Sequence, residues 1–148
     1  MYLKKRKILI KQIKVLKLAC DSQKSSSEVT CIEQDPNNPQ RLAVGYLDGT
    51  LRLFNLKTKP QGASNEFSNQ VSIEQQSIKC FLTFNGHKTS ITSINFDSQG
   101  VRLVTGSKDT ELVIWDLIGE CGLFRLKGHK APINKAVFMN KLNVLISW

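Results

Sequence analysis

The sequence predicts an all-β fold made of two to three four-stranded antiparallel units that follow one another along the chain. Three observations support this prediction. A Gly-His-Lys triplet at 86–88 recurs 42 positions later at 128–130. Apolar and β-branched residues keep the same offset over the next twenty positions without a gap. Short β-rich runs alternate with turn residues inside each period, as expected for closely spaced strands. The residue pairs that share the offset are Ile91 and Ile133, Phe96 and Phe138, Leu103 and Leu145, and Thr105 and Ser147.

The central unit contains four predicted strands. They are Ile91–Phe96, Arg102–Gly106, Leu112–Trp115 and Gly122–Leu126. Turn-forming residues separate the first three, at Asp97–Gly100 and at Lys108–Thr110. Four strands in about 42 residues are typical of one blade of a β-propeller, so the expected fold is a partial propeller.

A second copy of the unit lies upstream. Arg41–Leu56 aligns with Arg102–Leu117 at an offset of 61, and the alignment extends back to about Glu28. This offset is longer than the 42-residue period, and the excess fits a polar insertion, Lys57–Gln76, which is predicted to be a surface loop. The predicted blades are therefore a divergent one at about 28–84 with its inserted loop at 57–76, a regular one at about 86–126, and a truncated one at 128–148.

The net charge of +9 is concentrated at the N-terminus. Residues 1–24 hold eight Lys or Arg against the single acid Asp21, so the remainder is nearly neutral. The basic segment 1–27 fits an outer strand of a preceding blade and also an amphipathic helix. A nuclear-localisation signal at 4–7, an RNA-contacting arm, a membrane-surface helix and a plain solvated extension all remain open for it.

Composition argues against several other classes. No run of about 18 apolar residues exists and no secretory signal is evident, so an intracellular protein without a membrane partner is expected. The cysteines show no CxxC spacing, which argues against a zinc site or a disulfide framework. They are expected to be reduced and mostly buried, and they are Cys20, Cys31, Cys80 and Cys121.

The motifs of the central unit resemble the WD40-repeat family. The resemblance rests on Gly86-His87, the strand at Gly106-Ser107, the turn residue Asp109 and the pair Trp115-Asp116, and it covers residues 28–148. It implies a structural hydrogen-bond network of His87, Ser107, Asp109 and Trp115. In this network Ser107 is expected to bond to the imidazole and to accept the indole N–H. Weaker equivalents are expected at Asp48, Phe54 and His129.

Catalytic, cofactor and metal sites are not expected. A Ser-His-Asp nucleophile needs a strained elbow and an oxyanion hole, whereas the segment around Ser107 reads as a strand entering a hairpin. The triplet at 86–88 lacks the upstream glycine of a phosphate-binding loop. His87 and His129 have no further ligand nearby in sequence, so structural roles are favoured for both over metal binding.

The outer units depart from the family pattern. Upstream, Tyr46 stands at the predicted serine place and Phe54 at the tryptophan place, while only Asp48 of the network is kept. Downstream, the given sequence stops at Trp148, one residue before the position that corresponds to Ser107. Since a propeller usually has four to eight blades, a fragment of a longer protein is the favoured interpretation, and a ring completed by another chain is an alternative.

Finer similarities point to one branch of the family. The phrases "LAVGYLDG", "FNGHKTSIT", "GSKDTELVIWD" and "GLFRLKGHK" together resemble the WD-repeat subunit of the UTP-B subcomplex of the small-subunit processome. The resemblance implies a nucleolar scaffold for pre-rRNA processing whose partners are other UTP-B subunits, processome proteins and pre-rRNA or snoRNA, with no small-molecule substrate. Lysines near the turns at one end of the blades are candidate phosphate or partner contacts: Lys88, Lys108, Lys127 and Lys130. The alternative is an interaction module in another pathway, such as a ubiquitin-ligase adaptor or a trafficking coat.

Overall fold

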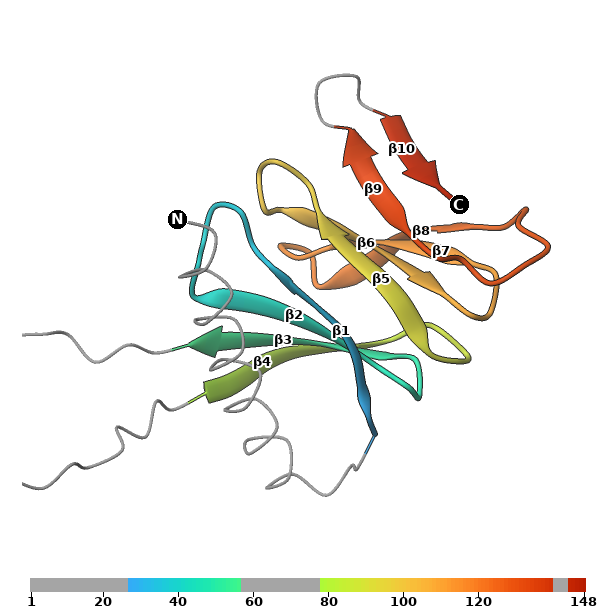
Figure 1. The fold of residues 1–148 in the computed structure, drawn as a ribbon. Helices are drawn as coiled ribbons and strands as arrows, with labels where there is room; N and C mark the ends of the chain where they lie inside the picture. Colours follow the sequence, from blue (N-terminus) through green and yellow to red (C-terminus); the bar gives the residue numbers. More distant parts are fainter. Residues whose placement is uncertain (1–26, 57–77, 140–143) are drawn as a thin grey trace, which may run out of the picture.

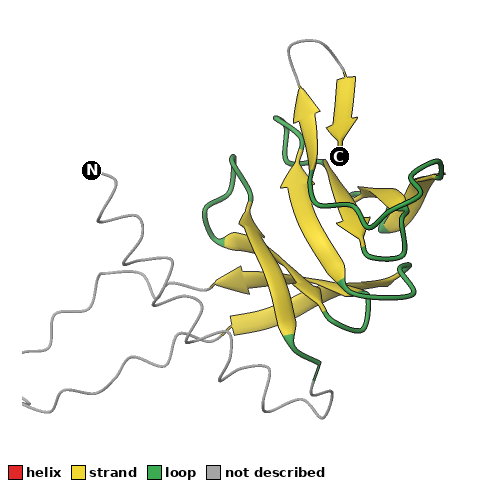
Figure 2. Ribbon diagram, turned by 45° about the vertical axis from the view of Figure 1, so that its right-hand side comes forward, coloured by secondary structure: helices red, strands yellow, loops and turns green. Residues whose placement is uncertain are grey.

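The structure is a computed structural model that describes residues 27–56, 78–139 and 144–148. The described residues form ten β-strands joined by turns and loops, and they include no helix long and apolar enough to cross a membrane (Figure 2). The strands are β1 Val29–Gln34, β2 Arg41–Tyr46, β3 Thr50–Leu56, β4 Ile78–Asn85, β5 Ile91–Phe96, β6 Arg102–Ser107, β7 Leu112–Asp116, β8 Cys121–Leu126, β9 Ala136–Met139 and β10 Val144–Ser147.

The strands form three antiparallel sheets in chain order. The first sheet is β1-β2-β3-β4, the second is β5-β6-β7-β8, and β9 and β10 form a third, two-stranded sheet (Figure 1). The four strands predicted in the central unit are all present, and β5 has the predicted bounds. The all-β prediction is confirmed. The basic segment 1–27, apart from its last residue, and the inserted loop 57–76 lie outside the described residues.

Successive sheets are arranged as blades around their first strands. β1 contacts β5 and β5 contacts β9, so the first strand of each sheet lies beside that of the next (Figure 1). The pairing register also repeats. Ile94 faces Thr105 in the second sheet, and Ala136 faces Ser147 in the third, at the same 42-residue offset. The two-stranded sheet is therefore the first half of another blade.

Apolar side chains fill the spaces between neighbouring sheets. The first interface joins β2, β3 and β4 of the first sheet to β5, β6 and β7 of the second sheet. The second interface joins the second sheet to the third, two-stranded sheet. Because each fully buried large apolar side chain stabilises the fold by about 1.5–3 kcal/mol, these interfaces are the main source of stability. The first contains Ala43, Leu51, Leu53, Phe84, Ile91, Ile94, Phe96, Leu103, Val113 and Trp115, and the second contains Val104, Leu112, Ile133 and Ala136.

A β-bulge near the start of the first strand of each four-stranded sheet fastens that strand to the next sheet. The register of β1 shifts around Thr30 and that of β5 around Thr92. The Thr30 hydroxyl reaches the Ile91 carbonyl oxygen at 2.6 Å, and the Thr92 hydroxyl donates in the same way to the carbonyl of Ile133. A bulge turns a side chain out of the regular alternation, which is what places these hydroxyls between sheets.

A glycine in the second strand of each four-stranded sheet leaves room for the next sheet. A Cβ at Gly45 would lie 2.8 Å from Cγ2 of Ile91, and a Cβ at Gly106 would lie 2.6 Å from Cγ2 of Ile133. Both isoleucines are fully buried. The repeated glycine is therefore set by the close approach of a β-branched side chain from the following blade.

Gly106→Ala should lower the free energy of unfolding by about 1–3 kcal/mol, because the added methyl overpacks a closed interface. Gly122→Ala is the matched control, since its Cβ would meet no atom closer than 3.5 Å. The control should leave stability almost unchanged. Chemical denaturation of both variants checks the prediction, and equal midpoints would contradict it.

Candidate polar network and interaction rim

Four side chains from four neighbouring segments converge at one end of the second sheet. His87 lies in the loop between β4 and β5, Thr105 is near the end of β6, Asp109 is in the turn between β6 and β7, and Trp115 is on β7. The antiparallel order brings these segments together although they are spread over 29 positions of sequence.

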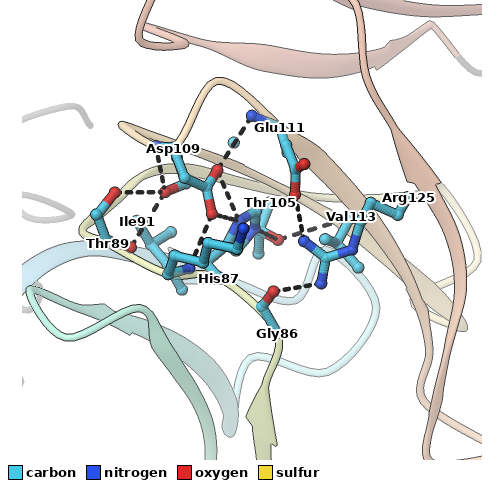
Figure 3. Close-up of polar contacts among 12 residues, drawn as sticks. Gly86, His87, Thr89, Ile91, Thr105, Asp109, Glu111, Val113 and Arg125 are labelled. Carbon is cyan, nitrogen blue, oxygen red and sulfur yellow. Dashed lines mark hydrogen bonds and ion pairs between the residues drawn. The ribbon is translucent and has the colours of Figure 1, made fainter.

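The four side chains form a continuous chain of hydrogen bonds. The Trp115 indole N–H donates to Thr105 Oγ1 at 2.9 Å, and Thr105 Oγ1 lies 2.7 Å from His87 Nε2. His87 Nδ1 lies 3.0 Å from Asp109 Oδ2 (Figure 3). A neutral imidazole satisfies all partners when Nδ1–H donates to the carboxylate and Nε2 accepts from the threonine hydroxyl. Such a network fixes the loop and the turn to the strands.

The Asp109 carboxylate also organises its own turn. Its Oδ2 accepts the backbone N–H of Lys88 at 2.9 Å, and its Oδ1 accepts that of Glu111 at 3.0 Å. Burial raises the pKa of Asp109, but these two backbone donors and His87 outweigh it, so the pKa lies below its ordinary value. The carboxylate is thus held ionised by donors that belong to the fold.

Ser107 does not link the imidazole to the indole, so the expected role of this residue is wrong. Its hydroxyl oxygen instead accepts the backbone N–H of Asp109 at 3.1 Å and donates to the Thr89 carbonyl at 3.1 Å. Thr105, two residues earlier, makes the two bonds that were predicted for Ser107. Residues two apart share a face of a strand, so the spacing alone could not choose between them. The available signal was the repeat, which aligns Thr105 with Ser147.

The geometry does not fit a nucleophile. Thr105 and Ser107 are both fully buried, at 0% exposure, and each hydroxyl is engaged by protein groups. A nucleophilic hydroxyl must reach a substrate in an open cleft. The polar set instead serves the packing of the sheets.

Trp115 also closes the interface between the first two sheets. Its ring stacks on Phe84 of β4, with the centroids 4.6 Å apart. A Cβ at Gly86 would lie 2.3 Å from Cη2 of the indole, so only glycine fits there. The Arg125 guanidinium donates to the Gly86 carbonyl and to the Glu111 carboxylate beside this contact (Figure 3). The network and the apolar interface therefore meet at the indole.

The first sheet has replaced the polar bonds by apolar packing. Phe54 is buried at the Trp115 place, and Val44 stands where Thr105 stands in the second sheet. Tyr46, at the place of Ser107, is buried in the same cluster. Asp48 is exposed, and its carboxylate accepts the backbone N–H of Thr50 at 2.9 Å within the turn.

The third sheet carries the start of the same network. His129 Nε2 lies 2.8 Å from Ser147 Oγ, which repeats the bond between His87 and Thr105. The counterpart of Ser107 would be position 149, one residue after Trp148, as the sequence analysis has it. The hydroxyl of this network is instead the counterpart of Thr105, and that residue is Ser147.

The four candidate lysines gather at one end of the sheets. Lys88 is in the β4–β5 loop, Lys108 in the β6–β7 turn, and Lys127 and Lys130 in the β8–β9 loop, and antiparallel connections place these loops at the same end. All four are exposed. Lys127 Nζ lies 3.5 Å from Glu111 Oε1, so this lysine also forms an ion pair within the protein. We call the four side chains the lysine rim.

The cysteines differ from expectation. Cys80 and Cys121 are exposed and Cys31 is half-buried, so the prediction of mostly buried cysteines is wrong for the first two, whereas Cys20 lies outside the described residues. All three described cysteines are free thiols. Burial raises the pKa of the Cys31 thiol to about 11, which keeps it uncharged. The described part of the chain holds no cluster of three metal-ligating side chains.

The network predicts an acid-sensitive fold. Burial lowers the pKa of His87 below its ordinary 6.5, and the attraction of Asp109 opposes this without reversing it. The unfolded chain then binds a proton near pH 6.5 that the folded chain takes up only at lower pH, so stability is full above 6.5 and falls as the pH drops below it. The limiting slope is about 1.4 kcal/mol per pH unit for one proton.

Urea denaturation between pH 7.5 and pH 5 measures this slope. His87→Gln is the control, because glutamine cannot take up a proton, and the variant should lose most of the slope in this range. A wild-type stability that does not decrease toward pH 5 would contradict the buried neutral imidazole.

The chain belongs to the WD40-repeat family. The family described as "WD domain, G-beta repeat" matches residues 13–55 and 78–116, which together are more than half of the chain. Among solved structures, the β-propeller domain of Cps50 (Swd1) from Myceliophteria thermophila is similar, with a TM-score of 0.57 and 20% identity over 77% of this chain and 30% of that chain. This likeness shows the β-propeller fold.

Curated relatives carry several different names. CCR4-associated factor 4 of Saccharomyces cerevisiae is 33% identical over 94 residues, which are 63% of this chain and 14% of the relative. Protein HIR1 of Kluyveromyces lactis is 35% identical over 94 residues, 64% of this chain and 11% of the relative. U3 small nucleolar RNA-associated protein 12 of Saccharomyces cerevisiae is 40% identical over 66 residues, 45% of this chain and 5% of the relative. The chain thus spans no more than about a seventh of these proteins.

Proposed function

We propose that this protein is a non-catalytic WD40 scaffold of the small-subunit processome, acting in nucleolar pre-rRNA processing. Proteins of the WD40 family are in general interaction scaffolds. The observation that carries the specific proposal is the 40% identity to U3 small nucleolar RNA-associated protein 12. Ribosome biogenesis protein ERB1 of Scheffersomyces stipitis, 28% identical over 60% of this chain and 11% of its own length, supports the same process.

The lysine rim supplies a physical means of contact. The polar network holds the β4–β5 loop and the β6–β7 turn in fixed positions, which presents Lys88 and Lys108 on a rigid base. Exposed ammonium groups on fixed loops suit the phosphates of RNA, and they add affinity without reading sequence. Other faces of the blades remain for protein partners, expected to be UTP-B subunits.

A second candidate is an interaction module in another pathway. CCR4-associated factor 4 and Protein HIR1 match a longer stretch of the chain than the small nucleolar RNA-associated protein does, 94 residues against 66. A ubiquitin-ligase adaptor or a trafficking protein would share the same blades. The fold alone does not choose among these roles.

Purification of the tagged protein from its own cells, with mass spectrometry and sequencing of cross-linked RNA, tests the proposal. We expect UTP-B subunits, U3 snoRNA and pre-rRNA. Alanine at all four positions of the lysine rim should reduce RNA recovery while protein partners remain, whereas Lys79→Ala on β4 should have no effect. Recovery of ligase or coat subunits without rRNA precursors would refute the processome role.

A further inference from the structure

The same tight turn occurs in both four-stranded sheets, at the end where the lysine rim lies. In the turn between β2 and β3, the Gly49 N–H donates to the Tyr46 carbonyl oxygen at 3.2 Å. In the turn between β6 and β7, the Thr110 N–H donates to the Ser107 carbonyl oxygen at 3.3 Å. The residue that closes such a turn lies in the left-handed region, and φ is 86° at Gly49 and 70° at Thr110.

Threonine is an unfavourable residue at this position. Glycine adopts a positive φ freely, whereas the branched Cβ of threonine crowds the backbone there. The first sheet uses glycine, and a Cβ at Gly49 would also lie only 2.5 Å from the His87 carbonyl oxygen. Among the described residues, Thr110 and Glu120 are the non-glycine residues with positive φ, and only Thr110 is branched at Cβ. Glycine at position 110 would therefore relieve backbone strain.

The fold does not use the hydroxyl group of Thr110. Within the described part of the chain this oxygen has no hydrogen bond, whereas the hydroxyls of Thr105 and Ser107 are both engaged by protein groups. Thr110 is half-buried, so part of the side chain is open to solvent. Backbone strain that benefits neither packing nor internal hydrogen bonding points to a role in binding.

Three lysines of the lysine rim are connected to this turn. Lys108 belongs to the turn itself. The backbone N–H of Lys88 donates to Asp109 Oδ2 at 2.9 Å, and Lys127 Nζ lies 3.5 Å from Glu111 Oε1. The strained threonine lies between these two acids in the chain. Ammonium groups from three separate loops therefore belong to the surroundings of one hydroxyl that has no partner in the fold.

The two acids beside the threonine are already occupied by the protein. The Asp109 side chain is 4% exposed, and its carboxylate faces the His87 imidazole. The Glu111 side chain is 14% exposed and forms ion pairs with Arg125 and Lys127. The exposed charge at this turn is therefore mainly that of the lysines, which favours an anionic ligand.

We propose that the Thr110 hydroxyl donates a hydrogen bond to one phosphate of an RNA backbone, beside the ammonium groups of Lys88 and Lys108. The inference rests on the proposed function and adds a contact residue to the lysine rim. Threonine hydroxyls commonly donate to phosphate oxygens in nucleic-acid complexes. A lysine ammonium is a mobile point charge, whereas a hydroxyl on a fixed turn gives the contact a direction.

Three substitutions at position 110 test the hydroxyl. Fluorescence anisotropy measures the binding of a short labelled single-stranded RNA to the 148-residue chain. Thr110→Val keeps the branched shape but lacks the hydroxyl, and it should bind about tenfold more weakly, as expected for one lost hydrogen bond to a charged group. Thr110→Ser keeps the hydroxyl and should bind like wild type. Thr110→Gly should bind as weakly as the valine variant, while its Tm rises by about 2 °C because the strain is relieved.

The salt dependence of binding separates a hydroxyl contact from a displaced turn. Lys108→Ala should lower the slope of log Kd against log salt concentration by about one, because one phosphate contact is lost. Thr110→Val should leave the slope unchanged, since a hydroxyl releases no counterion. A valine that moved the neighbouring lysines would lower the slope as well. Thr83→Val, at an exposed threonine on β4, is the matched control and should change neither affinity nor slope.

The outcomes distinguish the role of Thr110 from that of the lysine rim. If Lys108→Ala weakens RNA binding and Thr110→Val does not, the role of Thr110 is refuted and the lysine rim stands. If neither variant changes the affinity, or the wild-type chain binds no RNA at low salt, RNA contact by the lysine rim is refuted as well. Displacement of the RNA by a phosphoserine peptide at lower concentration than by unlabelled RNA would make a phosphoprotein the ligand and would also overturn the proposal. The processome role is decided separately, by the purification of the tagged protein.

Discussion

Trp115→Ala should lower the free energy of unfolding by about 3–5 kcal/mol, the largest effect expected for one substitution in this chain. The indole is 5% exposed, stacks on Phe84 at 4.6 Å and fills the space above Gly86. Its removal opens a cavity between the first two sheets and also deprives Thr105 of a donor. Thermal and chemical denaturation of the purified chain measure the loss.

Trp115→Phe separates the two contributions of the indole. Phenylalanine keeps most of the ring packing but has no N–H, and Phe54 occupies the corresponding place in the first sheet. We expect this variant to lose about 1 kcal/mol from the missing hydrogen bond and a further amount from reduced volume, well below the loss in the alanine variant. If phenylalanine cost as much as alanine, packing would not be the main role of this side chain.

The fold could be predicted because its determinants are periodic. A blade repeats every 42 residues, the strands begin and end at turn residues, and the close approach of sheets selects glycine at 45 and 106. Repetition of one residue class at a fixed offset is visible in a single sequence. The four strands of the central unit followed from this pattern.

The site was predictable only in part. His87, Asp109 and Trp115 lie in one chain of hydrogen bonds that passes through Thr105. The choice between Thr105 and Ser107 depends on which hydroxyl faces the indole, and two residues on one face of a strand cannot be told apart from the sequence pattern. The exposure of Cys80 likewise depends on which strands border the sheet, since an outer strand has no further strand beside it.

Thr105→Val should lower the free energy of unfolding by about 2–4 kcal/mol. The substitution keeps the shape of the side chain but removes the one oxygen that joins Trp115 Nε1 to His87 Nε2. Two buried polar groups then lose their partner, and each such loss costs about 1–3 kcal/mol. Val44 occupies the corresponding position in the first sheet, where Phe54 requires no acceptor, so the cost comes from the network and not from valine in a strand.

Two controls make this prediction specific to the hydroxyl. Thr105→Ser retains the oxygen and should recover most of the lost stability, apart from the methyl contact. Ser107→Ala should lower the free energy of unfolding by only about 1 kcal/mol, because the Ser107 hydroxyl accepts the Asp109 N–H in the turn, and its loss leaves the ring nitrogens of His87 and Trp115 with their partners.

The pH dependence gives a second readout. Without its hydroxyl partner, His87 Nε2 is freer to take up a proton, so the acid transition of Thr105→Val should differ from wild type while that of Ser107→Ala should not. A larger loss in Ser107→Ala than in Thr105→Val would restore the serine as the central member and refute the assignment of Thr105.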